Sequence, residues 1–366
     1  MMMANIRGAL RGVVDFPRRK RQRSEWEHIR YADGAAPVLG LGGLLAPGRF
    51  VHGGAVKLLS LRDAMTTDEE RFNVLYLVSS AQPEFAEDLV AACRRQGIKF
   101  VWNQNGVGYP GWAGAEAARH NVPMRKLRAA ADFVVYQSEF CRSSAGRFLG
   151  LCANPSVVLL NPVDLTKFTP RQQPLPFAPL RLLAMGTQNY RQRVVAVLDC
   201  VRALRRTGLE CTLTVAGPLL WRNAETDLGN LIEQPDLAGA VSVRPAFGQD
   251  EAPAIYREHH ILVHPKYLDP CPTVVAEALA CGLPVVGSRS GGIPEMTDPE
   301  CAGLIDVPLV WDRLITPSGD ELAGAVRRIA GDLADASRAA RRRAESLFDA
   351  RRWVETHREI FQNLLA

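Results

Sequence analysis

The stretch HPKYLDPCPTVVAEALACGLPVVGSRSGGIPE, residues 264–295, decides the fold that this sequence predicts. An apolar strand runs into a proline-rich loop, and a short helix is expected over 274–280. Gly282 stops that helix, a buried strand is expected over 283–287, and a turn with two glycines follows. A helix between two continuously apolar strands is typical of a parallel sheet covered on both faces.

Two acidic residues flank the proline-rich loop, Asp269 and Glu277, with seven residues between them. The backbone N–H groups at Thr273 and Val274 begin the helix and have no intrahelical partners, so they form a site for a phosphate. Carboxylates do not bind phosphate usefully, but they accept hydrogen bonds from hydroxyls. The local chemistry therefore predicts a sugar–diphosphate–ribose ligand across this helix start.

These residues also resemble the carboxylate–seven–carboxylate motif of the family 4 retaining glycosyltransferases (glycosyltransferase group 1). The run EALACGLPVVGSRSGGIPE is similar to that family, although Asp269 stands where Glu is usual. The loop Pro270-Cys271-Pro272 replaces a Gly-containing one, and Asp-Pro-Cys-Pro resembles a variant of bacterial surface-polysaccharide enzymes. The resemblance implies that Glu277 contacts the ribose and Asp269 the donor sugar, with Pro272 in the donor loop.

The resemblance also implies the fold class: α/β of the GT-B type, with two Rossmann-like doubly wound domains and a cleft between them. Strand and helix patterns alternate from residue 38 onward, and a segment with five prolines interrupts them at 161–180. The expected parts are a basic, partly amphipathic leader (1–30), an N-terminal acceptor domain (31–165), a Pro-rich linker (166–180), a C-terminal nucleotide-sugar domain (181–345) and a final helix that crosses back to the first domain (346–366).

The loop after the first strand of the second domain supplies candidate donor ligands. Gly186 lets the chain approach a ligand closely, and Arg191 and Arg193 can hold a diphosphate by forked hydrogen bonds. The family has an Arg–Lys pair here that neutralises the leaving diphosphate. Arg191 fits the Arg, whereas Gln192 stands at the Lys position, which leaves Arg193 as a candidate replacement. The alternative for both arginines is a solvated helix start.

Candidate residues on the acceptor side lie in the first half of the chain. A turn at His52-Gly53-Gly54 opens a helix that faces the expected cleft, and the family has a glycine-rich turn there. Asn105 and Tyr109 follow a strand end, where the family contacts its acceptor. The alternative for the glycines is a simple tight turn.

The net charge of +5 is concentrated at the start of the chain. The first 30 residues contain eight basic and three acidic side chains, so the remainder is formally neutral. A neutral body argues against a nucleic-acid partner. Residues 1–23 predict binding to an anionic membrane surface, with a helix that caps the neighbouring domain as the alternative. The absence of a long apolar run or a signal pattern, and eight scattered cysteines, favour a cytoplasmic protein, peripheral on the inner face of the membrane.

The predicted activity is transfer of a sugar from a nucleotide diphosphate donor, a UDP- or GDP-sugar, to a hydroxyl of a glycan or lipid-linked acceptor in surface polysaccharide synthesis. Retention of configuration is implied by the resemblance. No metal or cofactor is expected, because the arginines and the helix start stabilise the departing charge. Two alternatives stay open: a GT-B sugar-nucleotide epimerase, and a non-catalytic nucleotide-sugar-binding partner of a polysaccharide assembly complex.

Overall fold

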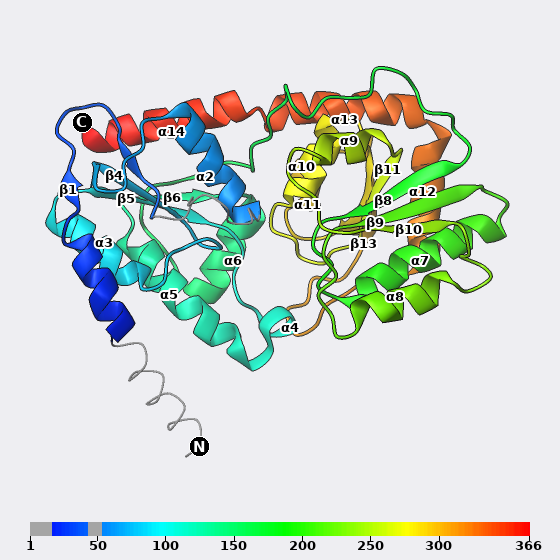
Figure 1. The fold of residues 1–366 in the computed structure, drawn as a ribbon, viewed down its shortest axis with the longest axis horizontal. Coiled ribbons are helices and arrows are strands. Elements are labelled where there is room, and N and C mark those ends of the chain that lie inside the picture. Colours follow the sequence, from blue (N-terminus) through cyan, green and yellow to red (C-terminus); the bar gives the residue numbers. More distant parts are fainter. Residues whose placement is uncertain (1–16, 43–52) are drawn as a thin grey trace, which may run out of the picture.

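The computed structural model describes residues 17–42 and 53–366, which form two α/β halves lying side by side (Figure 1). The first half contains a five-stranded parallel sheet, and all five residues of its strand β4, VLYLV, are buried. In sheet order the strands are β2 (Leu39–Gly40), β4 (Val74–Val78), β5 (Lys99–Gln104), β6 (Phe133–Tyr136) and β7 (Ser156–Val158).

The second half contains a six-stranded parallel sheet. In sheet order its strands are β10 (Val241–Arg244), β9 (Cys211–Ala216), β8 (Leu180–Met185), β11 (Ile261–His264), β12 (Val285–Arg289) and β13 (Ala302–Asp306). The order reverses between β8 and β11, and at such a switch point the loops after neighbouring strands separate and leave a crevice for a ligand. The carboxyl ends of β8 and β11 therefore mark where the second half can bind a ligand.

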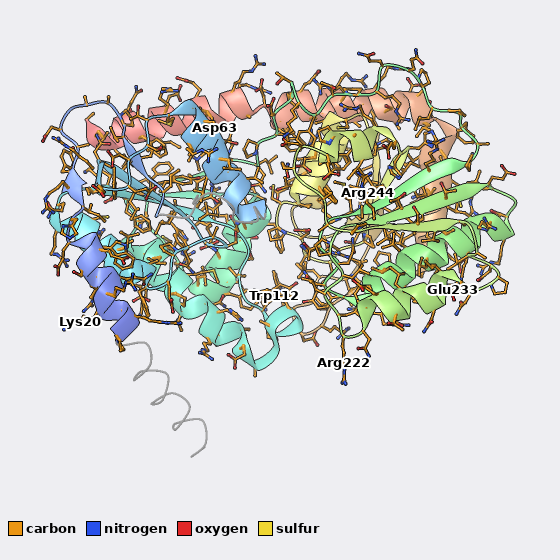
Figure 2. All side chains as sticks on the ribbon, viewed as in Figure 1. Lys20, Asp63, Trp112, Arg222, Glu233 and Arg244 are labelled. Atoms are coloured by element: carbon orange, nitrogen blue, oxygen red, sulfur yellow. The ribbon has the colours of Figure 1, made fainter. Side chains whose placement is uncertain are left out.

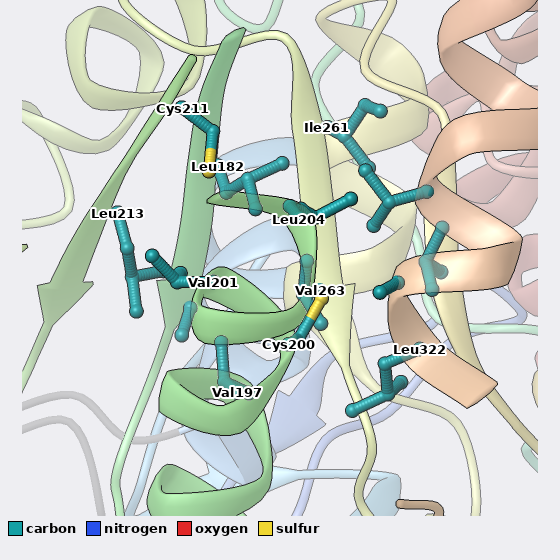
Figure 3. Close-up of a cluster of buried hydrophobic side chains, with 14 of the residues drawn as sticks. Leu182, Val197, Cys200, Val201, Leu204, Cys211, Leu213, Ile261, Val263 and Leu322 are labelled. Atoms are coloured by element: carbon teal, nitrogen blue, oxygen red, sulfur yellow. The ribbon is translucent and has the colours of Figure 1, made fainter. Parts of the chain in front are cut away.

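Helices cover both faces of each sheet, as continuously apolar strands require. In the first half they are α2 (Gly53–Ala64), α3 (Ala86–Arg95), α4 (Pro110–Ala113), α5 (Ala117–Ala130) and α6 (Glu139–Leu149). In the second half they are α7 (Arg191–Arg206), α8 (Ala224–Ile232), α9 (Ala252–Arg257), α10 (Thr273–Ala280), α11 (Ile293–Met296), α12 (Gly319–Gly331) and α13 (Leu333–Leu347). Figure 3 shows α7 and α12 meeting over the sheet, where Val201, Leu204 and Leu322 interdigitate with strand side chains such as Leu182.

The last helix, α14 (Ala350–Leu365), lies against the first half, while the preceding α13 lies against the second (Figure 1). Trp353 and Phe361 of α14 join the core that contains Leu39 and Tyr76. The chain therefore ends by packing on the half in which it began. The sequence predicts one terminal helical region, and the structure divides it at Phe348 and Asp349, where Asp349 caps α14 by accepting a hydrogen bond from the Arg351 N–H.

Several element boundaries differ from the expected ones. The helix expected over 274–280 begins one residue earlier, at Thr273, and the strand expected over 283–287 begins at Val285 because Leu283 and Pro284 complete the turn. The sequence pattern does not reveal β13. It also misses a small parallel pair, β1 (Arg30–Tyr31) with β3 (Arg71–Phe72), since two-residue strands carry too little periodicity.

The basic leader is partly incorporated into the fold. Its first 16 residues lie outside the described part of the chain, and residues 17–26 form a helix. Arg19 and Arg23 both pair with Asp88 at the start of α3, at 2.5 and 2.7 Å. Lys20 extends from the same helix into solvent (Figure 2). The capping alternative thus accounts for two of the basic groups, and the remainder of this helix surface is available to a partner.

Candidate active site

A cleft of about 750 Å³ lies between the two halves. Its walls come from both: the loops after β4, β5 and β6 on one side, and the loops after β8, β11 and β13 on the other. Several predicted site residues line it, namely Gly54, Asn105, Tyr109, Gly186, Arg193, Asp269, Pro272, Thr273 and Val274. The structure therefore brings together residues that are more than 200 positions apart in the chain.

The Asp-Pro-Cys-Pro loop is held in shape by the paired glycines that follow β12. Leu268, directly before Asp269, has a φ of 49°, a conformation that a branched side chain rarely adopts. A Cβ at Gly291 or Gly292 would collide with the backbone oxygens of residues 269 and 270. Glycine at both positions lets the two loops touch, and the Leu268 N–H also donates to Ser290 Oγ at 3.0 Å.

Asp269 is buried between two basic side chains. Lys266 Nζ lies 2.9 Å from its Oδ2, and His264 Nε2 lies 3.1 Å from the same oxygen. Burial by itself raises the pKa of Asp269, but the charge of Lys266 and the hydrogen bond from His264 outweigh it and hold this pKa well below its usual range. Asp269 is therefore a carboxylate at neutral pH. Neither Lys266 nor His264 was a predicted site residue, although His264 ends β11 and Lys266 follows that strand, both within five residues of Asp269.

The start of α10 faces the cleft without a side-chain cap. Pro272 occupies the N-cap position and cannot cap the helix with its ring. The first backbone N–H that returns to the Pro272 oxygen is that of Val275, at 3.0 Å. Thr273 and Val274 line the cleft, so their N–H groups are available to an anion, as the sequence predicts.

Glu277 lies one turn deeper on α10 and is not among the residues that line the cleft. Its Oε1 accepts from Gln249 Nε2 and its Oε2 from the Tyr256 hydroxyl, each at 2.8 Å. Burial raises the pKa of Glu277 to about 7, and these two hydrogen bonds oppose the shift. Gln249, which comes from the loop after β10, therefore occupies one acceptor position of the Glu277 carboxylate.

The two arginines of the α7 loop point to different places. Arg191 forms an exposed pair with Asp227, with Nε 2.6 Å from Oδ2, and it does not line the cleft. Arg193 does line the cleft, buried, with Nε and Nη2 donating to Gln188 Oε1. Asp227 of α8 is 36 residues away from Arg191, so the loop alone gave no sign of this pairing. Of the two arginines, Arg193 lines the cleft and Arg191 does not, and the diphosphate-binding role of Arg191 stays a prediction.

The wall from the first half is polar and carries an unforeseen cation. Gly54 packs so closely on Ser80 that a Cβ would collide with the serine oxygen. Gly53 begins α2, and the predicted His52 lies outside the described residues. Lys57, one turn into α2, is buried and donates to Asn103, Asn105 and Gln137. Lys57 is not among the residues that the sequence predicts for the site.

Hydrogen bonds across the cleft tie the two halves together. Ser138, which caps α6, donates from Oγ to the Pro270 oxygen at 2.7 Å. Asn161 Nδ2 donates to the Cys271 oxygen at 2.7 Å. Glu295 accepts from the Glu139 and Phe140 N–H groups at 2.7 and 2.8 Å, so it caps α6 of the opposite half. The sequence pattern does not indicate this contact, because the partners are over 150 residues apart.

Aromatic side chains close one end of the cleft. Trp311, in the loop after β13, stacks on Phe140 at an interplanar angle of 11° and meets Tyr109 edge-on. Trp112 of α4 stands between the two halves, half exposed, with His120 beside it at 5.5 Å (Figure 2). An exposed indole face in the wall of the cleft can pack on the apolar face of a sugar ring.

No group of three His, Cys, Asp or Glu side chains suited to a metal occurs within the described residues. None of the eight cysteines, all of which are described, forms a disulfide. Across 17–42 and 53–366, no helix is both long and apolar enough to span a bilayer.

Two doubly wound halves with a ligand cleft between them define the GT-B fold. The crystal structure of HepE from Anabaena in complex with UDP has the same fold, with a TM-score of 0.70, 15% identity and coverage of 92% of this chain and 100% of that one. Residues 179–332 match the family described as glycosyl transferases group 1.

Two curated relatives carry names from polysaccharide synthesis. The putative colanic acid biosynthesis glycosyltransferase WcaL of Escherichia coli (strain K12) is 27% identical over 45% of this chain and 43% of its own length. The amylovoran biosynthesis glycosyltransferase AmsK of Erwinia amylovora is 25% identical over 55% of this chain and 49% of its own length. The chain thus spans about half or less of each of these relatives.

Proposed function

We propose that this protein is a glycosyltransferase that moves a sugar from a nucleotide diphosphate donor to a hydroxyl of a glycan or lipid-linked acceptor during polysaccharide synthesis. The observation that carries the proposal is the C-terminal wall of the cleft. There the uncapped start of α10, Arg193 and Lys266 surround a space beside the ionised Asp269. This set of groups suits a sugar joined to a diphosphate, and the family of residues 179–332 supports the same assignment.

In this mechanism the bond from the sugar C1 to the diphosphate breaks as positive charge grows on the sugar ring. The N–H groups of Thr273 and Val274, with Arg193 and Lys266, stabilise the negative charge that develops on the diphosphate. Asp269 accepts hydrogen bonds from donor-sugar hydroxyls, and Glu277 accepts them from the ribose after Gln249 has moved. A leaving phosphate oxygen takes the proton of the attacking hydroxyl on the same face, which retains the anomeric configuration. Because protein groups supply the positive charge, we expect activity to persist in EDTA.

The acceptor enters from the wall formed by the first half, between Asn105, Tyr109 and Trp112. A membrane-bound lipid-linked acceptor fits the exposed basic groups of the helix at 17–26 and a protein peripheral on the inner face of the cell membrane. The UDP complex of HepE supports a uridine donor as the first one to test.

A thermal-shift screen with UDP-, GDP-, ADP- and dTDP-sugars tests the proposal. The right donor at 100 times its Kd should add about 2.7 kcal/mol to stability. Product analysis with that donor then separates the alternatives, since an epimerase needs no acceptor and a non-catalytic partner binds without turnover. The proposal fails if no nucleotide sugar raises the melting temperature. Retention fails if the anomeric proton coupling of the product shows inverted configuration.

A further inference from the structure

Lys57 is a buried cation that has no carboxylate partner among the described residues. Its exposure is 2%, and its ammonium donates to three neutral amide oxygens: Asn103 Oδ1 at 2.6 Å, Asn105 Oδ1 at 2.7 Å and Gln137 Oε1 at 3.0 Å. Buried ammonium groups normally pair with a charge. A fold that keeps one without a counter-charge beside a ligand cleft uses it for something other than stability.

The ammonium fixes which way these amides face. It has three donors and no acceptor, so each amide must turn its oxygen toward Lys57 and its NH₂ group away. The NH₂ of Asn103 then donates to the Tyr76 hydroxyl at 2.8 Å. The NH₂ of Asn105 donates to Ser80 Oγ at 2.5 Å. A flipped Asn105 would set its own N–H groups against the cation.

The orientation that Lys57 imposes on Asn105 also determines how the Ser80 hydroxyl forms hydrogen bonds. Because Ser80 Oγ accepts from Asn105, it keeps its own hydrogen for another acceptor, and no described protein group receives that hydrogen. Ser80 lines the cleft and is exposed. Gly54 makes room for it, since any larger residue there would collide with Ser80 Oγ. The chain of donors from Lys57 through Asn105 thus ends in an O–H group that is free to donate to a ligand.

We infer that Lys57 is a positioning residue. It fixes which groups of Asn105 and Ser80 donate and which accept hydrogen bonds, so that the Ser80 hydroxyl donates to an anionic oxygen of the bound ligand. The inference rests on the proposed function in one respect: that ligand is a phosphate-bearing nucleotide sugar. The buried charge favours an anionic oxygen over a neutral one, because no carboxylate near Lys57 cancels it within the described wall.

The protonation state of Lys57 gives the arrangement a measurable signature. Burial lowers the pKa of Lys57 to about 8. The titratable groups that face it are Cys141, Cys271, Tyr76 and His357. Burial raises the pKa values of both thiols and the phenol and lowers that of His357 to about 4. Among these groups only Lys57 changes charge between pH 7 and pH 9. A neutral amine can accept a hydrogen bond. Above pH 8, Lys57 therefore no longer fixes the donor–acceptor direction of the hydrogen bonds through Asn105 to Ser80.

The test has a ligand-free arm and a ligand arm. In the ligand-free protein, the side-chain ¹⁵N signal of Asn105, assigned through Asn105→Asp, should shift with a midpoint near pH 8. The shift should vanish in Lys57→Arg, whose guanidinium also only donates. An Asn105 signal that is flat with pH in the wild type, or equally shifted in Lys57→Arg, overturns the role of Lys57 whether or not any nucleotide binds.

In the ligand arm, UDP and uridine binding are measured by calorimetry at pH 7 for the wild type and its variants. Ser80→Ala and Lys57→Met should each weaken UDP about tenfold, and the double variant should be no weaker than the worse single one. Lys57→Arg should restore binding to near the wild-type value. Uridine affinity should be unchanged, which ties the effect to the phosphates. Ser60→Ala is the matched control, because its hydroxyl donates to the Val56 oxygen on the same helix.

Two results overturn the inference, and a third concerns the proposed function. Additive losses in the double variant mean that Lys57 does not act through Ser80. Equal weakening of UDP and uridine means that the contact is not to phosphate. If the wild-type protein binds none of the UDP-, GDP-, ADP- and dTDP-sugars, the proposed function fails. The ligand-free experiment still tests whether Lys57 orients Asn105. Titration of the same variants with inorganic pyrophosphate then tests whether Ser80 contacts an anion.

Discussion

On the first half of the molecule the cleft buries a cation among neutral amides, whereas on the second half it buries an anion between two basic groups. Lys57 keeps its charge by hydrogen bonding alone, and Asp269 keeps its charge by pairing with Lys266 and His264. The pairing cancels most of the field of Asp269, while the amides leave the field of Lys57 intact. The cleft as a whole therefore favours anions, although it contains a carboxylate.

The largest effect should come from breaking the paired side. Asp269→Asn removes the charge that holds Lys266 and His264 and leaves two basic groups without a partner at the donor position. We expect kcat/KM to fall on the order of 100-fold, since misplaced groups at the reacting centre have effects of that size. Steady-state kinetics with the donor from the screen measures this change. Asp250→Asn is the control, because that exposed aspartate pairs with Lys167 on the surface. Equal activity in both variants would contradict the assignment.

The next effect separates the two arginines of the α7 loop. Arg193→Ala should lower kcat about 10- to 100-fold, because a charged donor that strengthens its contact as the diphosphate departs is lost. Arg191→Ala should change kcat less than about twofold, since exposed ion pairs contribute little. Parallel kinetics of the two variants decides between them. A larger loss of kcat in Arg191→Ala than in Arg193→Ala would mean that Arg191 binds the diphosphate. It would also imply that this side chain leaves Asp227 when the donor binds.

Glu277→Gln should weaken donor binding about tenfold by calorimetry, because it removes a charged acceptor for the ribose hydroxyls. Exposed Glu300→Gln serves as the control.

The same variant should change how stability depends on pH. Burial raises the pKa of Glu277 from 4.5 to about 7, so the native state binds a proton in this range that the unfolded chain releases. The stability that this group contributes is fully present below pH 4.5 and is lost as pH rises through about 7. Urea unfolding from pH 4 to 8 should show a slope in the wild type that Glu277→Gln lacks, by at most about 3 kcal/mol. Parallel pH profiles would mean that Glu277 titrates normally.

The smallest effect concerns the N-terminal helix. Arg18→Glu with Lys20→Glu should weaken binding to anionic phosphatidylglycerol vesicles by roughly 1 kcal/mol per lost cation, more at low salt than at high salt. Melting should be unchanged, because these side chains are exposed. Asp88→Asn provides the contrast, since it frees Arg19 and Arg23 and should reduce stability instead. Unaltered co-sedimentation of the double variant would leave this helix a structural role only.

The sequence predicted the parts of this molecule that depend on neighbours in the chain. Continuous apolar strands, the helix stop at Gly282 and the uncapped start of α10 are local features, and the structure contains each of them. The partners that the fold brings together from distant parts of the chain could not be predicted in this way. Nothing near Lys57 indicates that strand ends 46 to 80 residues away will surround it with amides. Nothing in the α7 loop indicates that Arg191 will form an ion pair with Asp227.

The hydrogen bonds from residues 139 and 140 to Glu295 have a practical consequence for following the protein in solution. These two amide protons belong to one half, and their acceptor belongs to the other. If the halves separate, both protons meet water while the rest of α6 stays folded. Their hydrogen–deuterium exchange rates therefore report on separation of the two halves without any added label. A nucleotide sugar that holds the halves together should slow the exchange of these two protons, and its release should restore the original rate.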